Sequence, residues 1–222
     1  MQNESIKKFV VGFTYILNLM MLVTAIILMT MILITGVDPA KRLSSHVATI
    51  ALTFLPMLIY TFKKEKLNLF LYLFTAIYVF IAVFLGASLN FYNMYEHINY
   101  DKLVHVFFGY SSTLIGLYIL IKTNKLNTSS LFFNLLFLFS FAMMISAVWE
   151  IFEFSSDQFF HTTTQGRPQV IVGGGSLVDV GETMFDIISN LIGALIFMLQ
   201  LTWYYKTKKA PIMNFMINEL SK

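Results

Sequence analysis

The sequence has 222 residues, of which 57% are hydrophobic and only 12% are charged. Soluble domains carry charges on about a quarter of their residues, and a chain of this length has too little interior to bury so much apolar surface. These values exclude an ordinary soluble domain and predict an integral membrane protein. The absence of cysteine also excludes disulfides, thiolate metal sites and cysteine nucleophiles.

The apolar residues fall into six segments, each long enough to cross a bilayer, which requires about 20 residues. The first segment follows two lysines, as in a signal peptide, but its apolar run is longer than the roughly 7–15 residues of a signal sequence. We therefore interpret it as a retained span. The sequence predicts an all-α, polytopic bundle of about six transmembrane helices in a single domain, residues 1–222, with spans near 9–34, 45–62, 69–92, 101–122, 130–153 and 182–205.

Basic residues predict the orientation of this bundle. With the N-terminus inside, 11 of the 15 lysines and arginines fall on the inner side, as the positive-inside rule requires. Nine of the 12 acidic residues and all four histidines fall on the outer side. Acidic residues contribute little to the orientation rule, so their excess on the outer side needs a different explanation. We expect an N-in, C-in membrane protein with a polar site that faces outside.

Carboxylates at the end of the fifth predicted span are the first part of this site. Glu150, Glu153 and Asp157 are spaced i, i+3 and i+7, so one face of a helix carries all three. Ionisable groups in a hydrophobic helix are costly and suggest a functional site. The alternative is that they are solvated at the helix end.

Two further segments carry matching groups. Asp101 and His105 are spaced i, i+4 at the start of the fourth span. In the alternative interpretation, Asp101 caps the helix and His105 bonds to a neighbouring helix. At the start of the sixth span, one helical stripe carries Asp179, Glu182, Asp186 and Asn190.

The rise of 1.5 Å per residue places the three clusters in one outer layer. Carboxylates that converge in a partly dehydrated cavity must take up protons or bind a cation. Carboxylates with one imidazole suit Mg²⁺, Mn²⁺, Ca²⁺ or Zn²⁺. The predicted metal ligands are Asp101, His105, Glu150, Glu153 and Asp186; Glu150, Glu153 and His105 are candidate catalytic groups, and Asn190 would orient a ligand or substrate.

Other polar and small residues have simpler interpretations. We expect Gly193, on the same helix as Asn190, to permit close helix packing. The lone histidines His46, His97 and His161 are interpreted as solvated loop or helix-end residues. Arg167 could bind a phosphate headgroup or pair with one of the nearby acids.

Four short stretches together resemble a known family. They are YDKLVH at 100–105, AVWEIFE at 147–153, TQG at 164–166 and a D…D…N-x-x-G pattern through Asp179, Asp186, Asn190 and Gly193. Their order is similar to that of the uncharacterised bacterial YjdF-like membrane proteins and, more loosely, of the VanZ-like proteins linked to glycopeptide resistance. The resemblance covers about 100 to 199 and implies that Asp101, His105, Glu150, Glu153, Asp186 and Asn190 act together. It also implies that the protein is a multi-pass protein of the bacterial cell (plasma) membrane.

The resemblance does not imply a reaction. One departure from the family pattern, QVIVGGGSLV before Asp179, replaces an expected shorter, acid-rich turn that contains tryptophan. We expect a divalent-metal site that acts on an envelope lipid or lipid-linked precursor, with the bilayer and not nucleic acid as its partner. The alternatives are a non-enzymatic binder or a proton- or cation-coupled transporter, and a structural membrane protein.

Overall fold

The computed structural model describes the chain except residues 1, 39–41, 63–67, 161–168, 171–175, 178–179, 208 and 222; side chains are also not described at 2–7, 55–62, 69–70, 160, 169–170 and 176–177. The predicted roles of His161, Arg167 and Asp179 therefore lie outside the described residues. The described chain is almost wholly helical, in agreement with the predicted all-α class. It divides into two compact units, Met1–Asp101 and Lys102–Ser221, and each is described by itself.

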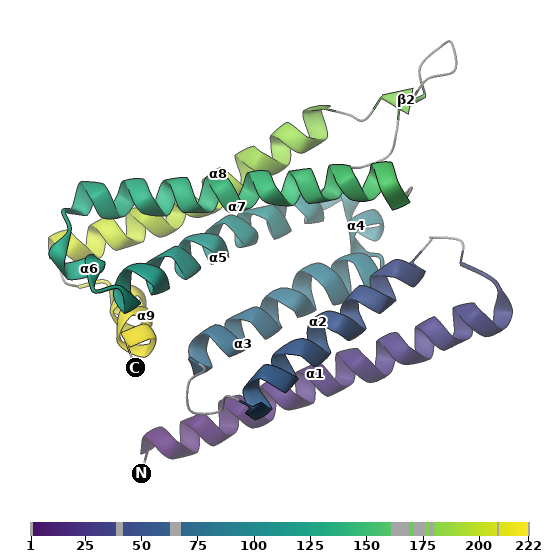
Figure 1. Cartoon of the computed structure of the whole chain (residues 1–222), viewed down its shortest axis with the longest axis horizontal. Helices are drawn as coiled ribbons and strands as arrows, with labels where there is room; N and C mark the ends of the chain where they lie inside the picture. Colours follow the sequence, from purple (N-terminus) through teal and green to yellow (C-terminus); the bar gives the residue numbers. More distant parts are fainter. Residues whose placement is uncertain are drawn as a thin grey trace. The chain divides into compact units, whose positions relative to one another are not determined.

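The first unit is built from two long helices and a third whose winding changes from α to π; Figure 1 shows them in purple to blue. α1 packs against α2 and α3, and α2 also packs against η1. η1 is a π-helix that continues α3 and ends where the Leu89 amide donates to the Phe84 carbonyl at 2.8 Å. Asn90 then adopts a left-handed φ of 69°, which ends the helix before the predicted boundary at residue 92. The elements are α1 (Gln2–Thr35), α2 (Leu43–Phe62), α3 (Leu69–Tyr78), η1 (Val79–Ser88), α4 (Phe91–Met94) and η2 (Glu96–Ile98).

The second unit consists of three long helices with a short helix at its C-terminal end (Figure 1). α7 packs against α8, and α5 contacts α7 where a Cβ added at Gly116 would lie 3.0 Å from the Leu138 side chain. Leu114, Leu117 and Phe197 are fully buried in its core. The elements are α5 (Tyr100–Lys122), α6 (Lys125–Thr128), α7 (Leu131–Phe160), the antiparallel pair β1 (Gln169–Val170) and β2 (Ser176–Leu177), α8 (Val180–Thr207) and α9 (Pro211–Ser221).

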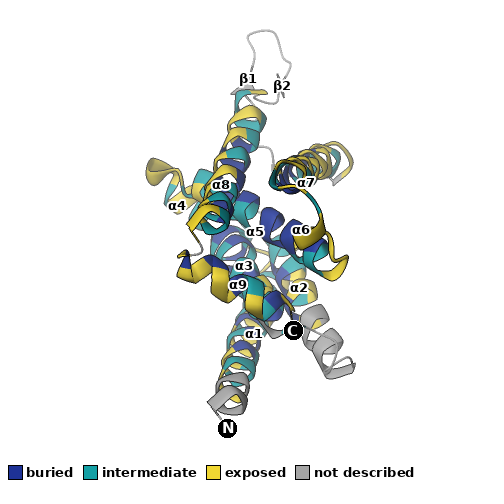
Figure 2. Ribbon diagram, turned by 90° about the vertical axis from the view of Figure 1, so that its left-hand side faces the viewer, coloured by how far each residue is buried: buried dark blue, intermediate teal, exposed yellow. Residues whose placement is uncertain are grey.

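Five helices in the described chain are long and apolar enough to cross a membrane. Five of the predicted spans correspond to them within a few residues. The other, 45–62, coincides with α2. The part of α2 whose side chains are described, Leu43–Phe54, is a shorter apolar helix. Exposed residues run along much of α1 and α7 (Figure 2), as expected for helices whose surface contacts lipid. The count of six and the N-in, C-in orientation remain predictions.

Candidate functional site

The site begins with a close crossing of α5 and α8. A Cβ atom added at Gly109 would lie 1.9 Å from the Asn190 carbonyl oxygen, and one added at Gly193 would lie 1.9 Å from the Val106 carbonyl oxygen. Only glycine allows the two backbones to approach in this way. Gly193 therefore has the packing role that the sequence predicted, and Gly109 is its partner. The crossing fixes which side chains face one another in the adjacent turns.

One turn from the crossing, three polar side chains meet between α5 and α8. His105 Nε2 lies 3.4 Å from Asp186 Oδ1, and His105 Nδ1 lies 3.3 Å from the Asn190 side-chain nitrogen. All three residues are buried. If Asn190 donates to Nδ1, the imidazole proton is on Nε2, where it faces the carboxylate. The two neighbours thus hold the ring in one plane, and the orientation of the Asn190 amide determines which tautomer they favour.

Lys102, one of the few basic residues predicted on the outer side, joins this group. Lys102 Nζ lies 2.6 Å from Asp186 Oδ1 and 2.7 Å from Glu182 Oε1. Lys102 is in the first turn of α5, three residues before His105, so both side chains project toward α8. The spacing of Lys102 and His105 can be read from the sequence, but the sequence does not show that α8 is the helix they face. The ammonium group supplies positive charge to two carboxylates at once.

α7 contacts the same group through Ser146. The Asn190 side-chain nitrogen donates to Ser146 Oγ at 2.7 Å. Glu150 and Glu153 follow Ser146 at i+4 and i+7, and all three side chains are buried. Glu153 Oε1 accepts a hydrogen bond of 2.7 Å from Trp149 Nε1. The two predicted glutamates therefore occupy the next turns of the helix face that reaches Asn190, and they are not solvated at a helix end.

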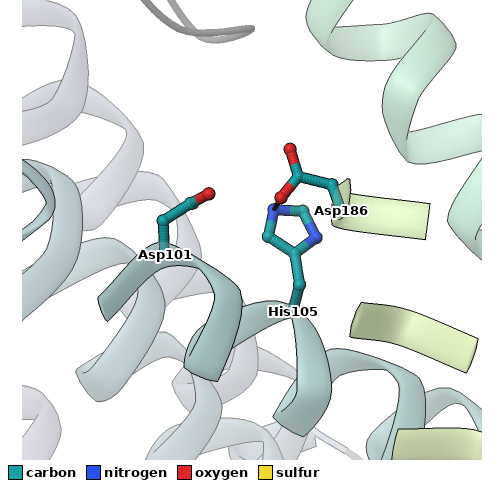
Figure 3. A group of neighbouring side chains, drawn as sticks. All are labelled: Asp101, His105 and Asp186. Carbon is teal, nitrogen blue, oxygen red and sulfur yellow. Dashed lines mark ion pairs between the residues drawn. The ribbon is translucent and has the colours of Figure 1, made fainter. Parts of the chain in front are cut away.

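Asp101, His105 and Asp186 form the group that could hold a metal ion. Each offers one ligand atom, and these atoms lie within 4.8 Å of one another. Figure 3 shows Asp101 and His105 on α5, with Asp186 projecting toward them from α8. His105 and Asp186 are buried, whereas Asp101 is half-buried. Three of the five predicted ligands thus come together, while Glu150 and Glu153 lie outside this group.

A second buried polar cluster is found in the first unit. His46, interpreted from the sequence as solvated, is fully buried, and its Nδ1 lies 2.5 Å from Ser88 Oγ. That interpretation was wrong because α2 turns His46 toward the end of η1. Arg42 Nη1 donates to the Ser88 carbonyl at 3.3 Å. The Asp38 carboxylate caps α2, accepting from the amides of Arg42 and Leu43 at 2.8 and 2.9 Å.

A family of membrane proteins matches most of the chain. The family described as "Predicted membrane protein (DUF2238)" matches residues 17–207. No curated protein and no solved structure gave a match. The match covers both clusters, and it confirms the predicted membrane class. The chain belongs to this family of membrane proteins, whose description assigns no activity.

Proposed function

We propose that the polar ends of α5, α7 and α8 form a divalent-cation site that acts on an anionic lipid or lipid-linked molecule of the bacterial envelope. The observation that carries this proposal is the grouping of Asp101, His105 and Asp186 ligand atoms within 4.8 Å. Two carboxylates and an imidazole suit Mg²⁺, Mn²⁺ or Zn²⁺.

Asn190 supports the proposal as a residue that positions His105. A metal ion at Nε2 requires the imidazole proton to lie on Nδ1, the nitrogen beside the Asn190 amide. Rotation of that amide would present Oδ1 as the acceptor for this proton. Asn190 Oδ1 is buried and has no hydrogen-bond partner among the described residues. The same side chain can thus stabilise either tautomer, as residues behind metal-bound histidines commonly do.

Lys102 would compete with a divalent ion for Asp186. The two cations share a carboxylate that is almost completely buried, and like charges at such a distance repel. Glu182 is more exposed, at 37% of its side chain, so a displaced lysine can remain at the edge of the site. There its three donors would bind the phosphate or carboxylate of a substrate. The proposal therefore gives Lys102 a role in substrate binding.

Glu150 and Glu153 supply the proposed acid–base chemistry. When bound, the ion would polarise a substrate phosphoryl group and acidify a water molecule. Glu150 and Glu153 are buried one and two turns beyond Ser146 on α7, and the proposal assigns them as the general bases. Trp149 holds one oxygen of Glu153 and orients that carboxylate. The reaction class best supported is hydrolysis or transfer at a lipid phosphate.

A proton- or cation-coupled binder is the second candidate function. Lys102, Asp186, His105, Asn190 and Ser146 form an unbroken series of side-chain contacts across three helices, which could relay a proton. A proton relay would also need polar groups that continue toward the other end of these helices. There the Asn134 side-chain nitrogen donates to the Leu126 carbonyl at 2.9 Å and to the Tyr205 hydroxyl at 3.5 Å. Tyr205 donates to the same carbonyl, so these side chains converge on one backbone group.

The cation proposal is tested by metal binding to the protein purified in detergent. Wild type, Asp186→Asn, His105→Gln and the control Glu96→Gln, an exposed residue outside the cluster, are dialysed against Mn²⁺, Mg²⁺ and Zn²⁺. We expect near-stoichiometric metal in wild type and control and a loss of at least tenfold in affinity in the two site variants. Equal metal content in all four proteins, or none in wild type, contradicts the proposal.

The proposed outward orientation has a separate test. Because the chain has no cysteine, single cysteines report their side of the membrane without a background signal. Glu96→Cys should react with an impermeant maleimide in intact cells, whereas Lys125→Cys should react only after lysis. The reverse pattern would place the site on the cytoplasmic side and exclude external envelope substrates.

A further inference from the structure

We infer that the lipid substrate enters the site from the side, with an acyl chain in a groove between α5 and α7. The inference rests on the proposed function. The cation site would bind the headgroup of the lipid substrate, and the groove would bind its acyl chain. The groove has a volume of about 300 Å³, and its lining is Phe108, Ile145, Val148, Trp149 and Phe152. All of these side chains belong to the second unit.

The groove and the polar cluster are neighbours on both helices, and the Trp149 side chain contacts both. Phe108 is three residues after His105 on α5, and Ile145 directly precedes Ser146 on α7. The Trp149 ring lies 5.6 Å from the Phe108 ring and 5.5 Å from the Phe152 ring, between centroids. Its Nε1 donates to Glu153. Trp149 thus lines the groove with its ring and contacts a site carboxylate with its polar edge, as amphipathic aromatics do where apolar and polar surroundings meet.

The chemistry of the groove specifies an acyl chain. Val148 and Phe152 are both 57% exposed, and only 22% of the apolar stretch of α7 is buried within the protein. On a helix that crosses a bilayer, the exposed surface contacts lipid chains. The volume lies at the lower end of the range for ligand pockets, which favours one chain segment over a whole lipid. The groove would select by shape, because the surrounding lipid is equally apolar.

The inference excludes a water-soluble substrate. A soluble phosphate ester would reach Lys102 and Asp186 from the aqueous end of the helices and would leave the groove without a role. An amphiphile places its headgroup at the level of the cluster while its chain remains at membrane depth. On α5, Phe108 lies about one helical turn below His105, while on α7 the groove residues Ile145–Phe152 occupy the same turns as Ser146 and Glu150. Headgroup and chain of one lipid are therefore covalently close enough to occupy both places.

The test uses phosphatidylglycerol with a photoreactive diazirine on one acyl chain, incorporated in nanodiscs with the purified full chain. Val148→Trp and Ile145→Trp fill the groove. Ile151→Trp is the matched control, because Ile151 is on the same helix, is 64% exposed and does not line the groove. Crosslinked peptides are mapped by mass spectrometry. We expect crosslinks concentrated on the lining residues in wild type, reduced at least fivefold by the filling variants and unchanged in the control.

Crosslinks spread evenly over the exposed face of α7 in wild type would overturn the inference, and that result needs no variant to fold. Equal crosslinking of Val148→Trp and Ile151→Trp would also overturn it. Mn²⁺ binding is measured on the same samples. Groove-specific crosslinks without Mn²⁺ binding would refute the cation site while retaining the acyl-chain groove. Mn²⁺ binding with unspecific crosslinks would refute the groove alone.

Discussion

The two buried polar clusters of this protein are built from similar residue types but use them differently. In the first unit, Asp38 and Arg42 direct their charges to backbone groups at the ends of α2 and η1. In the second unit, Lys102 and His105 on α5 both contact the Asp186 side chain on α8. Both clusters include a buried histidine.

The difference separates a structural cluster from a candidate site. Helix ends leave unsatisfied backbone groups that must be capped, so folding alone explains the bonds made by Asp38 and Arg42. Folding alone does not explain why ionisable side chains from different helices are paired in a membrane-spanning region, where such groups are expensive. Whether a polar side chain bonds to backbone or to a side chain of another helix therefore indicates its role better than its residue type does.

The largest expected effect comes from the crossing of α5 and α8. Gly193→Ala places a Cβ against the Val106 carbonyl, so the helices must separate, and we expect a loss of about 3 kcal/mol in unfolding free energy. Gly12→Ala in α1 is the control, because nothing lies within 4 Å of its added Cβ; it should be neutral or stabilising by up to about 1 kcal/mol. Denaturation in mixed micelles measures both. Equal stability of the two variants would refute the close crossing.

Substitution of one aspartate in each cluster should give unequal losses. Asp186→Asn removes the charge that Lys102 and His105 contact. We expect the unfolding free energy to fall by roughly 2 kcal/mol. Asp38→Asn keeps an oxygen that can cap α2, so its loss should be about 1 kcal/mol or less. The same denaturation experiment compares them. A larger effect at Asp38 would reverse our assignment of the structural cluster.

Lys102→Met should increase the affinity for a divalent ion. Removal of the ammonium group eliminates a competing charge at Asp186, and we expect Mn²⁺ to bind about tenfold more tightly, which corresponds to about 1.4 kcal/mol. Arg42→Met, in the other cluster, should leave Mn²⁺ binding unchanged. Isothermal titration of both variants provides the comparison. Weaker binding after Lys102→Met would show that the lysine helps to build the site.

The smallest effect is expected at the boundary between groove and cluster. Trp149→Phe keeps an aromatic ring beside Phe108 but removes the donor to Glu153. We expect the unfolding free energy to fall by about 1 kcal/mol. Trp203→Phe, at a residue that is 57% exposed, should be nearly neutral. Thermal unfolding in detergent measures both; an unchanged midpoint for Trp149→Phe would indicate that the hydrogen bond does not contribute to stability.

The long helices could be predicted because continuous apolar runs reveal membrane spans directly. The helical face that carries Asp186, Asn190 and Gly193 was also visible in their spacing. The pairing of Lys102 with Asp186 was not, because it depends on the rotation of α8 after a long connection. α9 was missed because it is too short to be a span, although its buried residues Met213, Met216 and Leu220 follow a helical repeat.

The burial of His46 could not be predicted for a related reason. Its partner Ser88 lies 42 residues further along the chain, at the end of a π-helix that has no clear sequence signal. The presence of polar residues on a span can thus be predicted from sequence, but their partners depend on helix rotation and packing.

Pulsed electron paramagnetic resonance of bound Mn²⁺ tests the central claim most directly, because it detects a coordinated imidazole nitrogen. We predict one nitrogen coupling in wild type, lost in His105→Gln and retained in the control His46→Gln. Weakened binding in Asp186→Asn would accompany this result. Bound Mn²⁺ without nitrogen coupling, or a coupling that persists in His105→Gln, would contradict a cation site built on His105.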